Sequence, residues 1–264
     1  MTEKNYVLIT GATGGLGKAF AITLAKQGKN LILTGRSAEK LNVLKEELKN
    51  AYGIEPLVFA ADLANEGSRY ALMSFIEGLN CKLCGLINVA GADIQKGVEA
   101  YTQEKIVFQC RVNFEAAVSL SRFALDHRCE DLKIVNVSSV SGIYPMPYFA
   151  IYSALKGALT SFSVSLREEM KGKGVSITAV LPGAMPTRED IKEQIKGQGL
   201  WGKLAAKSPE YVAEKSLKAV AKNKRKIIPG FWNKMMRLGT ALLPPSLKLR
   251  FIARRWSKIS KDAF

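Results

Sequence analysis

A glycine-rich turn near the amino terminus links a short apolar run to a helix-like one. The run Tyr6–Thr10 has the length and composition of a buried strand, and Lys18–Lys26 is predicted to be the helix behind it. The turn between them, Thr10–Gly17, contains four glycines. A strand, a glycine loop and a helix in this order place backbone N–H groups around an anion at the helix N-terminus. The arrangement predicts an α/β fold with a phosphate-binding turn.

The glycines of this turn have separate steric roles. Gly11 would permit the tight turn, Gly15 would let backbone N–H groups approach a pyrophosphate, and Gly17 would let the helix pack closely against the strand. Glycine-rich turns also end ordinary strands, and this spacing departs from the common G-x-G-x-x-G pattern. The turn by itself is therefore consistent with either a cofactor site or the ordinary end of a strand.

Further strand-like runs alternate with helix-like segments along the 264 residues. The predicted strands are Leu31–Thr34, Leu57–Ala61, Gly85–Val89, Lys133–Ser138 and Val175–Leu181, and the predicted helices lie around Glu39–Asn50, Arg69–Glu77, Glu104–Asp126 and Ile151–Met170. This alternation predicts an α/β protein with a Rossmann-like, doubly wound parallel sheet in a single domain. We expect residues 1–230 to form that domain and residues 231–264 to form a basic amphipathic C-terminal extension.

A tyrosine and a lysine four residues apart, Tyr152 and Lys156, follow Ser139 in the second half of the chain. On a helix these positions share one face, so the phenol and the ammonium group can point into one pocket. A phenol has a pKa near ~10, and a nearby ammonium group lowers it by stabilising the ionised form. The pair predicts a phenol tuned for proton transfer.

In their order along the chain these motifs resemble the short-chain dehydrogenases/reductases, whose pattern is T-G-x-x-x-G-x-G, then N-x-A-G, then a serine with Y-x-x-x-K. The resemblance runs from about Tyr6 to Gly230. The matching residues are Thr10, Gly11, Gly15 and Gly17; Asn88, Val89, Ala90 and Gly91; Asn113; Ser139, Tyr152 and Lys156; and Pro182, Gly183 and Thr187. Two departures are visible, because Val89 replaces the usual second asparagine and Leu155 replaces the usual serine before the lysine.

The resemblance implies a catalytic set of four residues. Tyr152 would donate a proton to a carbonyl oxygen during reduction, and Ser139 would hydrogen-bond that oxygen. Lys156 would also hold the nicotinamide ribose. Asn113 would shape the helix near the site and help to position a proton-relay water, and Asn88 would brace the central strands.

The resemblance also implies which residues line the cofactor site. Asp62 matches the aspartate that contacts the adenine. The other cofactor positions are Thr10, Gly11, Thr13, Gly15, Leu16, Gly17, Leu63, Asn88, Ala90, Gly91, Tyr152, Lys156, Pro182, Gly183 and Thr187. No metal ligand is expected.

The choice of cofactor is argued from the end of the second predicted strand. That strand leads into Gly35 and Arg36 without the acidic residue that would accept a ribose 2′-hydroxyl and repel a 2′-phosphate. Gly35 leaves room, and the planar guanidinium of Arg36 is suited to hydrogen-bond a phosphate. We therefore expect NADP(H). The alternative is that Arg36 is a solvated residue at a strand end.

Other chemistries find little support in the sequence. His127 is the only histidine, which argues against a Ser-His-Asp arrangement and excludes a multi-histidine metal site. Cys81 and Cys84 form a lone C-x-x-C without a second pair at zinc-ribbon spacing, so we expect reduced thiols. The polar start, Met1–Asn5, does not resemble a secretory signal, and we expect a cytoplasmic protein.

The segment between Ser139 and Tyr152 is apolar and aromatic from Ile143 to Phe149. In the resembling family this stretch lines the substrate pocket, and Arg188–Lys207 would be a mobile lid that excludes water. We expect a hydrophobic ketone or alcohol, such as a lipid or steroid. The alternative is that the apolar residues pack the loop itself.

The formal net charge is +16, and Lys222–Phe264 holds twelve Lys/Arg against one acid, Asp262. Pro244 and Pro245 could open a helix with an apolar stripe beside basic residues. The stripe is Leu249, Ile252, Trp256 and Ile259, and the cations are Lys248, Arg250, Arg254, Arg255 and Lys258. Such a helix can lie on an anionic membrane surface. Packing on the domain or on a second subunit is the alternative, and no motif supports nucleic-acid binding.

Two function classes fit the sequence. The first is an NADP(H)-dependent oxidoreductase acting on a small-molecule carbonyl or alcohol, which the complete set of Tyr152, Lys156, Ser139 and Asn113 favours. The second is a cofactor-binding regulator or membrane-surface scaffold without turnover, because fold does not imply function. The resemblance implies a homo-dimer or homo-tetramer formed through the two long helices. The second of these has small residues at Ser153, Ala154, Gly157, Ala158 and Ser161.

Overall fold

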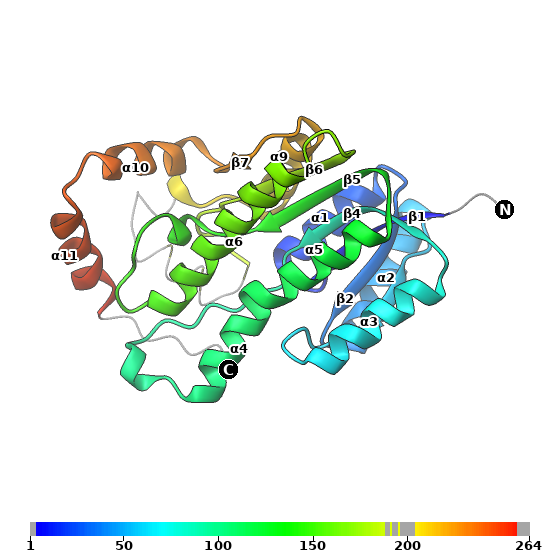
Figure 1. The fold of residues 1–264 in the computed structure, drawn as a ribbon, viewed down its shortest axis with the longest axis horizontal. Coiled ribbons are helices and arrows are strands. Elements are labelled where there is room, and N and C mark those ends of the chain that lie inside the picture. Colours follow the sequence, from blue (N-terminus) through cyan, green and yellow to red (C-terminus); the bar gives the residue numbers. More distant parts are fainter. Residues whose placement is uncertain (1–3, 188–190, 192–194, 196–203, 258–264) are drawn as a thin grey trace.

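The protein contains a single sheet of seven parallel strands with helices on both faces (Figure 1). The computed structural model describes residues 4–187, 191, 195 and 204–257, apart from the side chain of Arg255. The strands are β1 (Asn5–Thr10), β2 (Asn30–Gly35), β3 (Leu57–Ala60), β4 (Lys82–Asn88), β5 (Arg128–Val137), β6 (Val175–Val180) and β7 (Lys226–Ile227). Their order in the sheet is β3-β2-β1-β4-β5-β6-β7. The predicted doubly wound parallel sheet is confirmed.

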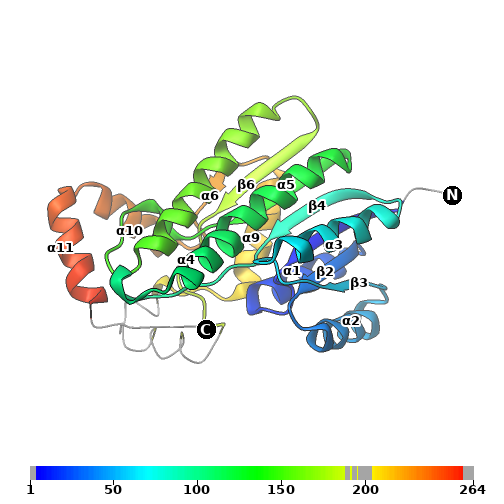
Figure 2. The same ribbon diagram turned by 60° about the horizontal axis from the view of Figure 1, so that its bottom comes forward.

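The helices cover the sheet in two layers. They are α1 (Gly15–Ala25), α2 (Ala38–Tyr52), α3 (Glu66–Gly78), α4 (Gln103–Cys110), α5 (Ala116–Asp126), α6 (Ala150–Glu169), α9 (Pro209–Ala221), α10 (Phe231–Ala241) and α11 (Pro245–Trp256). One apolar core joins the sheet to α1, α2 and α9, and a second joins it to α3, α5 and α6. Figures 1 and 2 both show α5 and α6 side by side.

Successive residues of a central strand enter opposite cores. In β1, Val7 and Ile9 pack in the core with α1, whereas Leu8 packs in the core with α5. Side chains alternate between the two faces of a strand, so a strand covered on both faces must be apolar at every position. This requirement explains why the central strands are continuous apolar runs.

The strand order reverses between β1 and β4. The chain builds outward from β1 to β3, returns to β4 beside β1, and then builds outward in the other direction. In open α/β sheets, the loops that follow two such strands leave toward opposite faces at the carboxyl ends of the strands. Such a switch point is where open α/β sheets bind their ligands.

The predicted single helix Glu104–Asp126 is wrong in detail. The structure has α4, then a π-helical segment, Arg111–Glu115, and then α5. Ala116 donates its backbone N–H to Arg111 O, a step of five residues instead of four. A π-bulge inserts one residue into a helical turn and is frequent at functional sites. Here it surrounds Asn113, whose contacts with the loop after β4 are described below.

Among the described strands and α-helices, α9, β7 and α10 have no counterpart in the sequence prediction. β7 has two residues, too few for a detectable alternation, and α9 packs on α1 and β6.

The predicted helix after Pro244 is confirmed as α11, although Lys258 and Ile259 lie outside the described residues. Both α10 and α11 lie at the end of the molecule opposite the amino terminus (Figures 1 and 2). In the described part of the chain, every helix is too short or too polar to cross a bilayer.

Candidate active site

Many of the predicted site residues come from six strands and meet at one edge of the sheet. Each follows or ends a strand at its carboxyl end: Thr10 for β1, Arg36 for β2, Asp62 and Leu63 for β3, Asn88, Ala90 and Gly91 for β4, Ser139 for β5, and Pro182, Gly183 and Thr187 for β6. Parallel strands deliver their carboxyl ends to the same edge. Residues far apart in the sequence therefore converge.

The turn after β1 forms a close-packed cradle that excludes side chains. Gly11 has φ +62°, and a Cβ on it would lie 3.0 Å from the backbone of Ala90. A Cβ on Gly17 would lie 2.1 Å from Gly11 O, which is sterically impossible. A Cβ on Gly15 would lie 2.7 Å from the side chain of Thr187. The turn therefore brings the amino end of α1 close to the loops after β4 and β6, and fits an approaching phosphate.

Thr10 joins the ends of β1 and β4. Its hydroxyl oxygen accepts hydrogen bonds from the backbone N–H groups of Val89 (3.0 Å) and Ala90 (3.1 Å). The Val89 departure from the family pattern does not disturb these bonds, because both use backbone donors. Thr10 thus holds the chain that leads to Gly91 against the glycine turn.

Asn88 connects the central strands through a buried amide network. Its Nδ2 donates to Asn136 Oδ1 over 2.8 Å, and Asn136 Nδ2 donates to Ser163 Oγ over 2.9 Å. The three side chains lie on β4, β5 and α6, and each is almost completely buried. The expected bracing role of Asn88 agrees with these bonds.

Asn113 fastens the π-helical segment to the loop after β4. Its Oδ1 accepts from Ala92 N–H (3.1 Å), and its Nδ2 donates to Ala92 O (2.8 Å). A Cβ on Gly91 would lie 2.8 Å from Asn113 Oδ1 and 3.2 Å from Lys156 Nζ. Asn113, Gly91 and Lys156 therefore meet at one point.

Lys156 is buried at the centre of the site. Its side chain is 3% exposed, and its Nζ donates to Val137 O, at the end of β5, over 3.0 Å. Burial lowers the pKa of Lys156 to about 8, against the opposing effect of the Asp93 carboxylate. The ammonium group is thus held close to the carboxyl end of the sheet in a poorly hydrated place.

Tyr152 lies one helical turn before Lys156 on α6. The Lys156 Nζ is 5.6 Å from the centre of the Tyr152 ring, and the ring stacks on Phe149 with centroids 4.4 Å apart. Ser139 sits at the start of a short 3₁₀ turn, where its hydroxyl oxygen accepts from Ser141 N–H over 3.1 Å. A side-chain bond from Ser138 Oγ to Lys156 O (2.7 Å) ties the end of β5 to α6.

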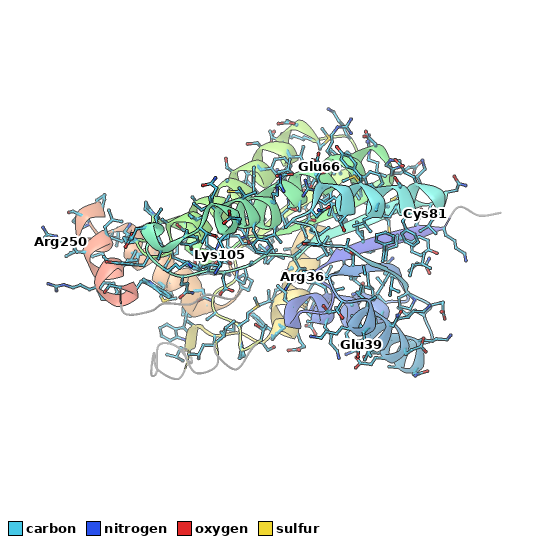
Figure 3. The ribbon with its side chains drawn as sticks, turned by 90° about the horizontal axis from the view of Figure 1, so that it is seen from below. Arg36, Glu39, Glu66, Cys81, Lys105 and Arg250 are labelled. Atoms are coloured by element: carbon cyan, nitrogen blue, oxygen red, sulfur yellow. The ribbon has the colours of Figure 1, made fainter. Side chains whose placement is uncertain are left out.

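The residues expected at the adenosine end lie at the rim of this edge. Arg36 is exposed between β2 and α2 (Figure 3). Asp62 is also exposed, and its Oδ1 accepts from Ala64 N–H over 3.0 Å. Leu63 and Leu16 are buried, and Thr13 lies against Gly35.

The carboxyl end of β6 completes the edge. Pro182 O accepts a hydrogen bond from Val140 N–H over 3.0 Å, which joins it to the loop that carries Ser139. A Cβ on Gly183 would lie 2.7 Å from the side chain of Asn233 on α10. Most of the expected lid, Arg188–Lys207, lies outside the described residues.

Several residues that neighbour the site are not predicted by the sequence. Asp93 acts electrostatically on Lys156, and its only signal was its place two residues after the N-x-A-G motif. Gly142 allows the 3₁₀ turn to touch α6, since a Cβ on it would lie 2.6 Å from Gly157 N. Trp256 of α11 stacks on Phe149 with ring centroids 6.1 Å apart, a contact that no local sequence pattern predicts.

The comparisons with known proteins agree on the family. The model of the short chain dehydrogenase family matches residues 5–196. A very-long-chain 3-oxoacyl-CoA reductase of Bos taurus is 31% identical over 229 residues, which cover 83% of this chain and 70% of the relative. The same enzyme of Anas platyrhynchos is 32% identical over 190 residues, 69% of this chain and 60% of the relative. The chain thus spans 60% to 70% of the length of these relatives.

Solved structures give the same result. A 7β-hydroxysteroid dehydrogenase structure superposes with a TM-score of 0.84 at 26% identity, covering 94% of this chain and 96% of the other. A short-chain dehydrogenase from Sphingobium yanoikuyae in complex with NADPH superposes with a TM-score of 0.76 at 26% identity, covering 90% and 94%. The resemblance predicted from the motifs is confirmed, and the chain belongs to the short chain dehydrogenase family.

Proposed function

We propose that this protein is an NADP(H)-dependent oxidoreductase that interconverts a carbonyl and an alcohol on a hydrophobic, lipid- or steroid-like substrate. The observation that carries this proposal is the convergence of Lys156, Asn113 and Gly91 beside Tyr152 and the glycine turn. A protein that only bound a dinucleotide would not need a buried lysine one helical turn from a phenol.

In the proposed reduction, Tyr152 donates its phenolic proton to the carbonyl oxygen, and the Ser139 hydroxyl hydrogen-bonds the same oxygen. Lys156 stabilises the phenolate that remains and holds the nicotinamide ribose. Asn113 keeps the π-helical segment in place and positions the water that returns a proton. When bound, NADPH supplies the hydride, and the protein supplies geometry and electrostatics.

Three observations support NADP(H). The glycine cradle leaves room for the pyrophosphate of a dinucleotide, because no Cβ fills it. Arg36 is exposed directly after β2, and no acid follows this strand before Glu39, which supports a contact with a ribose 2′-phosphate. The structurally similar dehydrogenase from Sphingobium yanoikuyae holds NADPH.

The proposed substrate class follows from the loop between Ser139 and Tyr152. Tyr144, Pro145, Met146 and Pro147 line an open groove with the outer face of α6. The similar proteins include very-long-chain 3-oxoacyl-CoA reductases and a 7β-hydroxysteroid dehydrogenase, which supports an apolar carbonyl compound.

The substitution Tyr152→Phe tests the mechanism. We expect kcat with a ketone panel to fall by about 10²–10⁴-fold, because the proton donor is lost. The dissociation constant for NADPH should change little. Tyr148→Phe, in the same loop, is the matched control. Turnover that survives in Tyr152→Phe would refute the mechanism, and NADPH binding without turnover in the wild type would favour the cofactor-binding regulator or membrane-surface scaffold.

We also infer a homo-dimer or homo-tetramer that pairs through α5 and α6. Ala154, Ala158 and Ser161 are exposed along α6, and such small side chains allow two helices to approach closely. Light scattering of the purified protein checks the inference, and a monomer at micromolar concentration would contradict it.

We further infer a cytoplasmic protein that touches an anionic membrane surface through the extension at residues 231–264. The twelve cations against one acid in Lys222–Phe264 support this contact. Binding of the full chain to anionic vesicles checks it.

A further inference from the structure

Helix α10 presents its apolar face to solvent. Phe231, Met235, Leu238 and Leu242 recur at helical spacing and are 65%, 43%, 60% and 83% exposed. On the opposite side Asn233 is 2% exposed, and its Nδ2 donates to Ala205 O (3.0 Å) and Pro229 O (2.9 Å). An amphipathic helix normally buries its apolar stripe, so this orientation leaves an apolar surface without a cover among the described residues.

Helix α11 has apolar residues on two sides, one in contact with the protein and the other exposed to solvent. Two residues of the stripe expected to face a membrane contact the protein: Trp256 stacks on Phe149, and Leu249, which is 37% exposed, lines the groove beside α6. Leu247 and Phe251, on the other side, are 54% and 69% exposed. The described part of the predicted stripe therefore contacts the chain itself, and Leu247 and Phe251 are the more exposed apolar pair on this helix.

The charged residues of α10 and α11 are all positive. Lys234 and Arg237 on α10, and Arg250 and Arg254 on α11, are exposed. Arg250 is labelled on α11 in Figure 3. The sequence from Lys222 to Trp256 contains no Asp or Glu. Apolar side chains bordered by cations match the boundary between acyl chains and anionic headgroups.

A second copy of this chain fits the surface less well. In a two-fold symmetric contact the same patch would face itself, which would bring its cations together without any carboxylate from Lys222 to Trp256 to offset them. An anionic bilayer supplies the missing negative charge and covers the apolar residues at the same time.

We propose that Phe231, Met235, Leu238 and Leu242 of α10, with Leu247 and Phe251 of α11, form a docking face for a bilayer that contains anionic phospholipid. The inference deepens the proposed membrane contact by naming its face, which differs from the predicted stripe.

Docking through this face places the active site next to the bilayer. The inner side of α11 reaches Phe149, which stacks on Tyr152. Tyr144, in the same loop, hydrogen-bonds Thr240 of α10 through its hydroxyl group and lies 4.9 Å under the Lys248 ammonium. The two helices thus touch the bilayer on one side and the substrate loop on the other. The substrate that fits this arrangement is a carbonyl lipid that partitions into the membrane.

Vesicle flotation of the full chain tests the proposal. The probes are vesicles of phosphatidylcholine alone and vesicles with phosphatidylglycerol added. We expect binding only to the anionic vesicles, and a partition coefficient about ten-fold lower for each of Leu238→Ser, Leu242→Ser and Phe251→Ser, because each removes an apolar side chain from the acyl boundary. Arg250→Gln should lower binding about five-fold. Tyr70→Ser, a 59% exposed aromatic on α3, is the matched control and should float like the wild type.

Three results would overturn the proposal. The first is equal flotation of the wild type and the Leu238→Ser, Leu242→Ser and Phe251→Ser variants. The second is an equal loss of vesicle binding in Tyr70→Ser. The third is a dimer in solution that Leu238→Ser dissociates, which would make a second copy of the chain the occupant of this face. Turnover of a water-soluble ketone is measured on the same proteins. A variant that turns over the ketone normally but no longer floats with the vesicles supports the docking face. If the wild type floats with the vesicles but turns over no ketone, the docking face is supported and the proposed oxidoreductase activity is refuted.

Discussion

At the scale of single residues, the most unusual group is the buried ammonium of Lys156. Its charge is separated from bulk water and faces Val137 O and the carboxylate of Asp93. A cation in such a place loses solvation, so its deprotonated form is favoured relative to the unfolded chain. The same isolation makes the charge more effective toward Tyr152, because less water screens it.

This burial predicts a pH-dependent stability. The pKa of Lys156 falls from its ordinary value of 10.5 to about 8 in the cofactor-free protein. Between these values the unfolded chain holds the proton and the folded chain does not, so the contribution of Lys156 to stability rises with pH. Relative to Lys156→Met, the wild-type free energy of unfolding should rise by about 3 kcal/mol from pH 8 to 10.5. Urea unfolding checks it, with the exposed Lys171→Met as control; a constant difference would contradict it.

We expect Arg36 to carry the preference between the two nicotinamide cofactors. A charge-assisted hydrogen bond contributes about 1.5–3 kcal/mol, so Arg36→Ala should raise KM for NADPH by about ten- to a hundred-fold and change KM for NADH little. Steady-state kinetics with both cofactors measures the effect. Lys26→Ala, an exposed cation at the far end of α1, is the control. Equal changes for both cofactors would remove Arg36 from cofactor selection.

At the scale of elements, the start of α1 depends on a glycine that no other residue can replace. A methyl group on Gly17 would meet Gly11 O at 2.1 Å, so Gly17→Ala must push the helix away from the turn. We expect a loss of about 1–3 kcal/mol in unfolding free energy and loss of NADPH binding. Chemical denaturation and fluorescence titration measure these. Gly78→Ala, in open space on α3, should keep both, and a normal Gly17→Ala protein would disprove the packing argument.

The helices and strands differ in how well the local sequence predicts them. The central strands and α1, α2, α3 and α6 were predicted within a few residues, because apolar runs and helical periodicity are local signals. The break in Glu104–Asp126 was not predicted, since Arg111–Glu115 contains no Pro or Gly. Its cause is tertiary: Asn113 bonds both backbone groups of Ala92, which lies on another segment.

At the scale of the whole molecule, the extension at residues 231–264 is joined to the catalytic loop. Tyr144 contacts α10 and α11 through Thr240 and Lys248, and Phe149 contacts Trp256. Deleting the chain after Gly230 should therefore lower kcat for a water-soluble ketone without any membrane, because Trp256 would no longer support Phe149, whose ring stacks on Tyr152. Stopped-flow turnover of the truncated and full chains measures it. Equal rates would show that the extension is only an anchor, and Trp256→Phe should restore most of the rate relative to Trp256→Ala.

The sequence by itself determined the parallel sheet, the glycine turn and the shared helix face of Tyr152 and Lys156, because periodicity and steric need are written in neighbouring residues. Only the tertiary structure decided that Asp93 acts on Lys156, that Asn113 meets Gly91, and which sides of α10 and α11 face water. These facts depend on contacts between distant segments. An amphipathic pattern states that a helix has an apolar side, but the rest of the fold selects what covers it.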